Sequence, residues 1–353
     1  MDKKRIVYFD VLKVLAFSAI IYYHMMVEMV RHDILPEVFN HDLYMNSNLH
    51  LATTAVALFF MLSGAGLMTS AERSSAPFSI GTYFKKRVVR ILIPYYIMSL
   101  AVFFINHGGH VPEGIAPWTL VFNLLAMDGF LANLGFPVMS LGVGEWFMGC
   151  IVIMYLVFPL LRLLLKKCPV PTLVLATAAA LIYGALYPWP IPYYQDLFLK
   201  MYEFLLGMAL ATVWQKLSRK WGCLWALLFA ALALWPTALP VPGAWLVPVS
   251  AVLLFMLGAS LDDSFSKMPR LSGFVKTAGT YAYDIFLVHH LVIILCLEKL
   301  WIARGMTDKF GLLFALDVVV IIIAGVCLHY ISDAVLRGVT ALKGAISGKT
   351  ARS

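Results

Sequence analysis

Four ionisable side chains fall within the first long apolar stretch of the sequence, residues 6–30, namely Asp10, Lys13, His24 and Glu28. At about 100° per residue, a helix would place all four within roughly 60° of one another on a single face. Charged groups are costly inside a membrane and therefore face a bundle interior or a water-filled cavity. The imidazole of His24 titrates near neutral pH and can act as a general base. The spacing therefore predicts that one face of the first helix carries functional residues.

Two members of this face differ in depth. Lys13 would lie about 10 Å from the start of the helix and His24 about 16 Å further along, at about 1.5 Å per residue. A cation near one membrane surface and an imidazole deeper inside suit a long substrate that is threaded from the cytoplasm. Simpler interpretations stay open, because Asp10 and Lys13 could form an i,i+3 ion pair that only anchors the helix, and His24 could be a hydrogen-bonded structural residue.

Arg87 and Arg90 lie three residues apart in KKRVVRILIPYY and would share a helix face at a membrane boundary. A guanidinium group matches the geometry of a phosphate, so the pair is a candidate phosphate-binding site. Cytoplasmic loops are rich in Lys and Arg for topological reasons as well, and the spacing alone does not separate the two explanations.

Two later stretches carry weaker candidates. Glu145 and Trp146 begin a span on the outer side, where Trp is typical of the interfacial aromatic belt and Glu145 has no obvious local partner. Asp284, His289 and His290 lie inside a late span, and we expect at most one of the two neighbouring histidines to line a given cavity. A proton path or a metal site is conceivable for these residues, but no HxxxH or carboxylate–histidine grouping completes a ligand set, so no metal site is expected.

These residues need a membrane-embedded frame to position them. Of the 353 residues, 61% are hydrophobic and 13% are charged, and the mean hydropathy is +0.85. A soluble domain carries about a quarter charged residues, so a soluble enzyme is excluded. The apolar residues come in runs of about 18 to 25, the length that crosses a hydrocarbon core of about 30 Å. Strand-like alternation over about ten residues is absent from the sequence, which argues against an outer-membrane barrel.

We therefore expect an all-α polytopic membrane protein with about ten transmembrane helices, at residues 6–30, 50–69, 88–106, 143–165, 170–187, 196–214, 221–238, 243–260, 278–300 and 311–337. The stretch 115–131 is apolar but short, and an interfacial or re-entrant helix is expected there. A single transmembrane domain would cover residues 1–340, followed by a short cytoplasmic tail at 341–353. Five cysteines without a CxxC motif predict neither a disulfide framework nor a zinc site.

Basic residues alternate between the loops. Lys and Arg cluster before the first expected span, after the second, fourth, sixth and eighth, and in the tail. The opposite loops hold few besides Arg31, Lys200 and three residues of the last loop. By the positive-inside rule, this asymmetry predicts an even number of spans with both termini in the cytoplasm. The same distribution explains the net charge of +8 without a nucleic-acid partner.

Several segments, in this order, resemble the acyltransferase-3 family of integral membrane proteins. The first helix of that family carries a basic residue, ten others and then a histidine, which Lys13 and His24 match. A Phe-Phe-x-x-Ser-Gly stretch of the family matches Phe59, Phe60, Ser63 and Gly64, and an Arg-x-x-Arg segment before Pro matches Arg87, Arg90 and Pro94. A Trp…Tyr…Pro segment matches Trp146, Tyr155 and Pro159. A late Tyr-x-x-Phe-Leu-x-His segment matches Tyr283, Phe286, Leu287 and His289. The sequence departs from the family pattern at Lys13, which is more often Arg, at Ala65, which is usually aromatic, and at Glu145, which is often apolar.

The resemblance implies a membrane-bound O-acyltransferase of the bacterial cytoplasmic (inner) membrane. It would move an acetyl or similar group from cytoplasmic acetyl-CoA to a hydroxyl of an extracytoplasmic or lipid-linked carbohydrate. His24 would be the general base or, alternatively, the carrier of an acyl-histidine intermediate. Lys13 would steady the pantetheine or thioester while Asp10 fixes Lys13, and Ser63 and the Gly64 backbone would approach the thioester.

The resemblance also implies where the two substrates bind. Arg87 and Arg90 would hold the CoA phosphates at the cytoplasmic mouth, and Glu145, Trp146 and His289 would lie on the acceptor side. Expected partners are the acyl-CoA, the carbohydrate and membrane lipid, while the identity of the acceptor, acetyl against succinyl, and the oligomeric state stay open. Two other functions stay open as well: a transporter or flippase for a polysaccharide intermediate, and a non-catalytic subunit of a glycan assembly complex.

Overall fold

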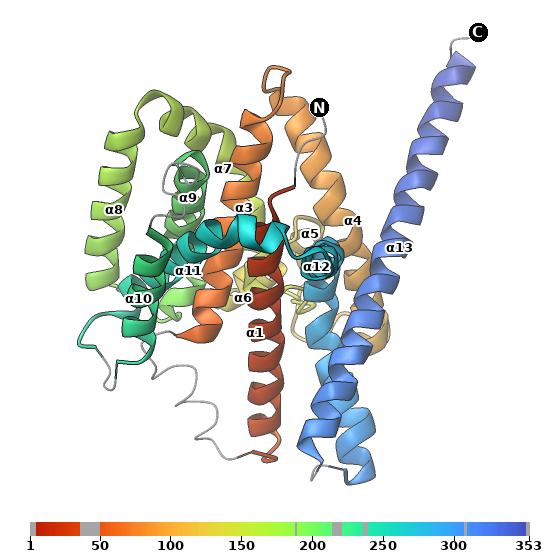
Figure 1. The fold of residues 1–353 in the computed structure, drawn as a ribbon. Helices are drawn as coiled ribbons and strands as arrows, with labels where there is room; N and C mark the ends of the chain where they lie inside the picture. Colours follow the sequence, from red (N-terminus) through yellow and green to blue (C-terminus); the bar gives the residue numbers. More distant parts are fainter. Residues whose placement is uncertain are drawn as a thin grey trace. The chain divides into compact units, whose positions relative to one another are not determined.

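The computed structural model describes residues 5–35, 50–187, 189–213, 221–235, 239–306 and 309–350, and every regular element within these ranges is a helix. Ten of the helices coincide with the ten apolar segments expected from the sequence, which confirms an all-α protein (Figure 1). They are α1 (Val7–Arg31), α3 (Leu51–Glu72), α4 (Ile80–His107), α7 (Glu145–Lys167), α8 (Pro169–Ala185), α9 (Leu197–Val213), α10 (Gly222–Ala233), α11 (Gly243–Ser266), α12 (Pro269–Leu295) and α13 (Phe310–Thr350). The last residues of two expected segments, 214 and 236–238, lie outside the described ranges.

Seven of the described helices are long and apolar enough to cross a membrane, namely α1, α3, α4, α7, α11, α12 and α13. The span of α12 continues through a π-helical turn, η4 (Cys296–Trp301), and a 3-10 turn, η5 (Ile302–Arg304). α8 and α9 have 17 residues each and α10 has 12, which is short of the roughly 20 that a typical span needs. These helices indicate an integral membrane protein, whereas the number of ten spans and the cytoplasmic termini stay predictions.

The stretch 115–131 is not one helix. It contains three short ones, η1 (Pro117–Thr119), α5 (Leu120–Leu124) and the start of α6 (Asp128–Asn133). The chain turns at Ala126, whose φ of 53° lies in the left-handed region. The buried Asp128 carboxylate holds this turn, because the Tyr95 hydroxyl donates to one oxygen at 2.5 Å and the Leu141 amide to the other at 2.9 Å. None of the three helices is long enough to cross a membrane.

The chain forms two compact units. The first consists of Met1–Phe78 and Cys150–Ala282, and the second of Ser79–Gly149 and Tyr283–Ser353. One boundary falls just before α4, and the other two fall inside α7 and α12. α13 continues to Thr350, so no helix end marks the predicted start of a tail at residue 341. Residues 351–353 of that tail lie outside the described ranges.

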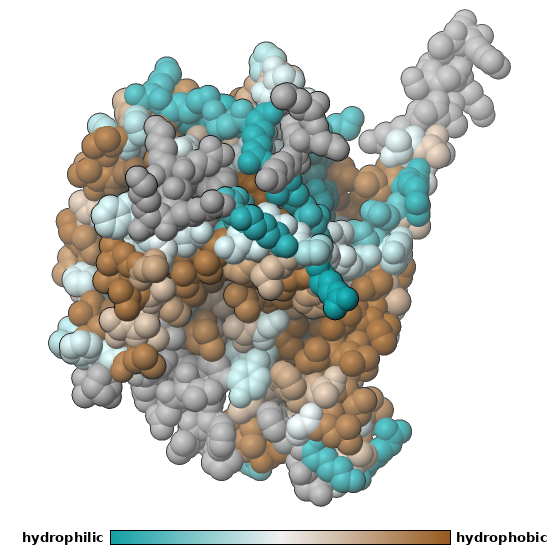
Figure 2. All heavy atoms as spheres, in the orientation of Figure 1, coloured by the Kyte–Doolittle hydropathy of each residue, from teal (hydrophilic) through white to brown (hydrophobic). Residues whose placement is uncertain are grey.

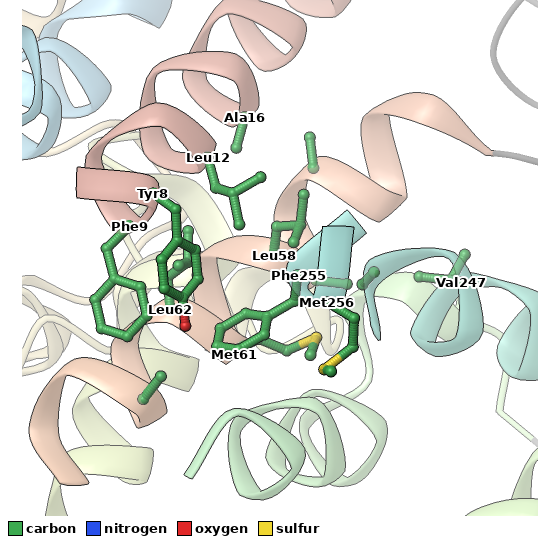
Figure 3. Packing of buried hydrophobic residues seen from close by; sticks show 14 of the residues in the cluster. Tyr8, Phe9, Leu12, Ala16, Leu58, Met61, Leu62, Val247, Phe255 and Met256 are labelled. Atoms are coloured by element: carbon green, nitrogen blue, oxygen red, sulfur yellow. The ribbon is translucent and has the colours of Figure 1, made fainter. Parts of the chain in front are cut away.

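The core of the first unit is packed from α1, α3 and α11. Tyr8 of α1 meets Phe255 of α11 edge to face with ring centroids 5.5 Å apart, and Met61 of α3 belongs to the same buried cluster (Figure 3). The Asp262 carboxylate of α11 accepts a hydrogen bond from the Tyr8 backbone amide at 2.9 Å. This acceptor satisfies one of the open amides at the start of α1 and places a negative charge where the helix dipole favours it. The N-terminal part of α1 is thereby fixed.

Two glycines let α3 and α9 cross at very close range. A Cβ added to Gly64 would collide with the backbone oxygen of Phe204, and one added to Gly207 would collide with that of Met61. Small residues at a crossing let two membrane helices approach backbone to backbone. The crossing therefore fixes α3 at the residue that follows Ser63.

Hydrophobic side chains cover much of the face drawn in Figure 2. On α8, Val174 and Leu175 are exposed, and on α13, Val319 and Ile323 are exposed. Water-soluble proteins rarely expose apolar patches of this kind, whereas lipid chains contact them without cost. The outer faces of these helices therefore suit a bilayer.

Candidate functional site

The Asp10 carboxylate is buried near the start of α1 and is held by two cations. The Arg5 guanidinium donates to both oxygens, with Nε 2.5 Å from Oδ2 and Nη2 2.9 Å from Oδ1. The Lys13 ammonium lies 3.8 Å from Oδ1, and 34% of the Lys13 side chain is exposed. A two-point guanidinium contact is the stronger of the two interactions. Asp10 is therefore fixed mainly by Arg5, a partner that the sequence analysis missed because Arg5 precedes the helix.

His24 lies in the second half of α1 and is partly buried. Its ring meets that of Tyr23 edge to face, with centroids 5.4 Å apart. Glu28, one turn further along, is buried, and its Oε1 lies 2.6 Å from Arg31 Nη1. Arg31 is the last residue of α1 and not a loop residue, which corrects its assignment from the sequence. Because α1 is unbroken from Val7 to Arg31, Lys13 and His24 share one helix face, as predicted.

Ser63 and Gly64 are neighbours on α3 with different surroundings. The Ser63 hydroxyl is partly buried and lies 3.4 Å from the Tyr155 hydroxyl of α7. Gly64 is buried against the backbone of Phe204, which accounts for the absence of a side chain at this position. The structure thus provides two hydroxyl groups that can donate hydrogen bonds, whereas a contact between Gly64 and a thioester stays a prediction.

Arg87 and Arg90 lie in the first half of α4. Arg87 is partly buried, and its Nε atom is buried with no hydrogen-bond partner among the described residues, whereas Arg90 is exposed. Leaving such a group unsatisfied costs about 1–3 kcal/mol, so an anion that accepts the hydrogen bond would be stabilised here. The geometry therefore fits the predicted phosphate-binding role better at Arg87 than at Arg90.

Glu145 is the first residue of α7 and pairs with a histidine that the sequence analysis did not choose. His290 Nδ1 lies 3.2 Å from Glu145 Oε1, while His289 is buried with Nδ1 2.5 Å from the Phe286 carbonyl oxygen. Both members of the Glu145–His290 pair keep some exposure, 37% for Glu145 and 21% for His290. A carboxylate beside an imidazole orients the ring and stabilises its protonated form, which suits acid–base chemistry or binding of a hydroxyl.

The backbone at Glu145 is held in an uncommon conformation. Glu145 has a φ of 45° and follows Gly144, whose φ is 67°. The left-handed region costs a residue with a side chain about 1–2 kcal/mol. The Glu145 carbonyl packs on Gly129, where any Cβ would collide with it, and Trp146 is buried beside it. Strain of this kind persists where the surroundings impose it, which is frequent at functional sites.

The ten predicted site residues are divided between the two units. The first unit holds Asp10, Lys13, His24, Ser63 and Gly64, and the second holds Arg87, Arg90, Glu145, Trp146 and His289. Within the first unit, the structure brings Lys13 to Asp10 and adds Arg5. Within the second, it brings His290 to Glu145.

A buried ion pair in α9 escaped the sequence analysis. Lys200 Nζ lies 2.5 Å from Glu203 Oε1, and these side chains are 1% and 2% exposed. The sequence analysis counted Lys200 with the loop residues although it lies in the expected segment 196–214, and the structure places it inside α9. Opposite charges three residues apart in an apolar run were the available signal.

Comparisons with known proteins agree with this helical, membrane-type architecture. The sequence model of the acyltransferase-3 family, described as an acyltransferase domain, matches residues 6–332 and so includes every predicted site residue. The chain is also similar to the acyltransferase MdmB of Streptomyces mycarofaciens, with 25% identity over 320 residues, which cover 80% of this chain and 80% of that protein. No solved structure matches.

Proposed function

This chain belongs to the acyltransferase-3 family, and from that premise we propose that it moves an acetyl or similar short acyl group from a cytoplasmic acyl-CoA to a hydroxyl of an extracytoplasmic or lipid-linked carbohydrate. The similarity to a protein named acyltransferase supports acyl transfer and names neither donor nor acceptor. The donor and acceptor classes rest on the site residues and on the family resemblance.

The observation that carries this proposal is the single face of α1, on which His24 lies with the Asp10–Lys13 pair. In the proposed reaction, His24 takes the proton of the acceptor hydroxyl while the oxygen of that hydroxyl attacks the thioester carbonyl carbon. The carbon–sulfur bond then breaks, and the departing thiolate receives the proton. An imidazole suits both steps because it gains and loses a proton near neutral pH. A covalent acyl-histidine route would use the same side chain.

The donor side of the proposal rests on basic groups. Arg87 binds a CoA phosphate through the buried Nε–H group that no described residue satisfies, and Arg90 adds an exposed guanidinium on the same helix. Lys13 steadies the pantetheine arm or the thioester, because its side chain is 34% exposed and its ammonium lies on the same helix face as His24.

Two hydroxyl groups are suited to the developing negative charge. Ser63 and Tyr155 lie 3.4 Å apart, and both can donate to the thioester carbonyl oxygen as it becomes an oxyanion. Donors fixed by helix packing, as Ser63 is beside the α3–α9 crossing, need little rearrangement during the reaction.

On the acceptor side, we assign the hydroxyl-binding role to the Glu145–His290 pair in place of His289. His289 is buried and its Nδ1 is engaged by the Phe286 carbonyl, whereas Glu145 and His290 both retain exposed surface. Trp146 follows Glu145 directly in the sequence and is buried, and its acceptor-side role rests on the family resemblance.

The proposed topology has ten spans with both termini in the cytoplasm of a bacterial cell. It is supported by the alternation of basic loops and by the agreement between the ten apolar segments and ten helices. In this orientation the basic start of α4 faces the cytoplasmic acyl-CoA.

The proposal is tested by thiol release from acetyl-CoA, using the purified full-length protein in lipid nanodiscs and a panel of glycan acceptors. We expect release that depends on an acceptor and that falls about 100-fold or more in His24→Ala. Arg87→Ala is expected to raise the KM for acetyl-CoA about tenfold with little change in kcat, because it removes one charge-assisted hydrogen bond. Lys86→Ala, which alters an exposed neighbour, is the matched control.

Two results would count against the proposal. Full activity in His24→Ala would remove the base from the mechanism. Absence of both turnover and acetyl-CoA binding in the wild type would instead favour a transporter or a non-catalytic subunit.

A further inference from the structure

A row of three titratable side chains leads from α12 to the exposed side of α13 in the second unit. Asp284 Oδ2 lies 2.9 Å from His329 Nδ1, and His329 Nε2 lies 3.8 Å from Asp333 Oδ2. The exposed fraction of the side chain rises along the row, from 6% at Asp284 to 25% at His329 and 55% at Asp333. Each ring nitrogen of His329 therefore faces a different carboxylate, one buried and one exposed.

The inner end of the row carries an unsatisfied oxygen. Asp284 Oδ1 is buried and has no hydrogen-bond partner among the described residues. The charged groups that act on the Asp284 carboxyl are His329 and Asp333. The hydroxyl of the preceding residue, Tyr283, donates to the Ile91 carbonyl of α4 at 2.9 Å and so does not serve Asp284.

The His329 imidazole also has an aromatic neighbour. The Tyr330 ring lies edge-on to the imidazole with centroids 5.9 Å apart. α4 packs along α13, and the Ile91 carbonyl of α4 accepts a hydrogen bond from the Tyr283 hydroxyl. His329 thus lies between the Asp284 and Asp333 carboxylates.

A purely structural role does not explain the whole row. One carboxylate and one partner would be enough to tie α12 to α13. Here a second carboxylate stands at the far nitrogen of the ring, and the buried oxygen of the first is left unsatisfied, which costs about 1–3 kcal/mol. Ionisable groups are rare inside membrane helices, and rows of Asp, Glu and His there serve as proton paths in other membrane proteins.

We propose that Asp284, His329 and Asp333 form a proton relay that connects the interior of the second unit with the exposed Asp333 carboxylate of α13. A proton on the Asp284 carboxyl passes to Nδ1 of neutral His329, which leaves a carboxylate and an imidazolium. A small side-chain rotation closes the 3.8 Å gap, and the imidazolium then passes its Nε2 proton to the Asp333 carboxylate, which releases it to solvent. His329 is then neutral with its proton on Nδ1. It regains its first tautomer when the ring rotates, takes a proton from solvent at Nε2 and loses the Nδ1 proton to solvent, so the cycle moves protons alone.

The use of this relay in catalysis rests on the proposed function. Acyl transfer moves one proton from a hydroxyl to a thiol. When the two substrates approach from opposite sides, proton exchange with solvent lets the site return to its starting protonation state. The relay itself depends on neither the donor nor the acceptor, so it can be tested without them.

The test is hydrogen–deuterium exchange of the Asp284 carboxyl, followed by infrared spectroscopy of the full-length protein in nanodiscs. The carbonyl band of the protonated acid is assigned by its loss in Asp284→Asn during an acid titration. On transfer to deuterated buffer, we expect the band to shift rapidly in the wild type and about 10- to 100-fold more slowly in His329→Gln. Asp333→Asn, at an exposed position, should also slow the shift, while Tyr330→Phe should not.

Two outcomes would overturn the relay. One is an exchange rate in both His329→Gln and Asp333→Asn equal to that of the wild type. The other is the absence of any carbonyl band that Asp284→Asn removes, because the first donor of the row would then be missing. If His329→Gln does not fold, the exchange rate of Asp333→Asn decides. A lack of acyl-transfer activity changes neither of these two outcomes, because the exchange is measured without substrates.

Discussion

Arg5 and Asp10 form a two-point ion pair at the start of α1, in which Nε and Nη2 of the guanidinium lie 2.5 and 2.9 Å from the two carboxylate oxygens. This contact gives Arg5 and Lys13 different roles, which the sequence alone does not distinguish. Arg5 neutralises and orients the buried carboxylate, and Lys13, whose ammonium lies 3.8 Å from Oδ1, is the cation that we propose binds the donor.

The first prediction separates these two roles. Arg5→Ala should destabilise the protein by about 2 kcal/mol, because a buried carboxylate loses charge-assisted hydrogen bonds. Lys13→Ala should change stability less and acyl-CoA affinity more. Thermal unfolding and donor binding, measured on both variants, check this, and a larger loss of stability in Lys13→Ala than in Arg5→Ala would reverse the assignment.

The second prediction concerns the close crossing of α3 and α9. Gly64→Ala places a Cβ against the Phe204 carbonyl and should cost about 1–3 kcal/mol by overpacking. Gly66→Ala, two residues further on the same helix, meets no atom within 4 Å and is the matched control. Thermal unfolding of the two variants measures the difference, and equal stability would mean that the helices separate without cost.

The third prediction uses the buried Lys200–Glu203 pair of α9. Lys200→Met leaves the Glu203 carboxylate without its partner in an apolar interior and should cost about 3–5 kcal/mol. The double variant Lys200→Met with Glu203→Leu removes both charges and should recover most of that loss. A double-mutant cycle by thermal unfolding gives the coupling, and additive effects would show that the two charges are stabilised by other groups.

The fourth prediction separates stability from activity at Glu145. Glu145→Gly relieves the left-handed backbone strain and should raise stability by about 1 kcal/mol relative to Glu145→Ala. Both variants lose the carboxylate beside His290 and should lose acceptor-dependent turnover alike. Unfolding and turnover are measured side by side. Retained turnover in either variant would exclude Glu145 from the acceptor site.

The helices were predictable because the signal for each is local. A run of apolar residues long enough to cross a membrane needs no knowledge of its neighbours, and the ten runs coincide with ten helices. The shared face of Lys13 and His24 follows from helical geometry alone. The broken stretch at 115–131 was less accessible, since its turn depends on the contact between Asp128 and Tyr95, which lie 33 residues apart.

The partners of the site residues were not predictable, because they depend on contacts between distant parts of the chain. The choice of His290 over His289 depends on where the start of α7 meets α12, which no local spacing encodes. Arg5 reaches Asp10 from outside the helix, where an i,i+3 or i,i+4 pattern does not apply. Asp284 and His329 come from two different helices and are 45 residues apart.

The last prediction concerns pH and His50, the residue that precedes α3. Burial lowers the pKa of the His50 imidazole below its ordinary value of 6.5. A positive charge is also unfavourable at a helix N-terminus. Its Nδ1 lies 3.5 Å from the Tyr193 hydroxyl, and burial raises the pKa of Tyr193 to about 12, so this hydroxyl stays neutral.

The sign of the effect follows from proton uptake. The unfolded chain binds more protons at His50 than the folded chain does. The stability that the neutral ring contributes is therefore present above about pH 6.5 and is lost as the pH falls from that value through the lower pKa of the folded ring. Asn tolerates the left-handed φ of 43° at this position, so His50→Asn should keep the fold while weakening the loss of thermal stability between about pH 7.5 and pH 5. His110→Asn, at an exposed histidine, should leave the acid dependence unchanged. An acid dependence that is the same in His50→Asn and in the wild type would mean that the imidazole is protonated in the folded protein, contrary to its buried position.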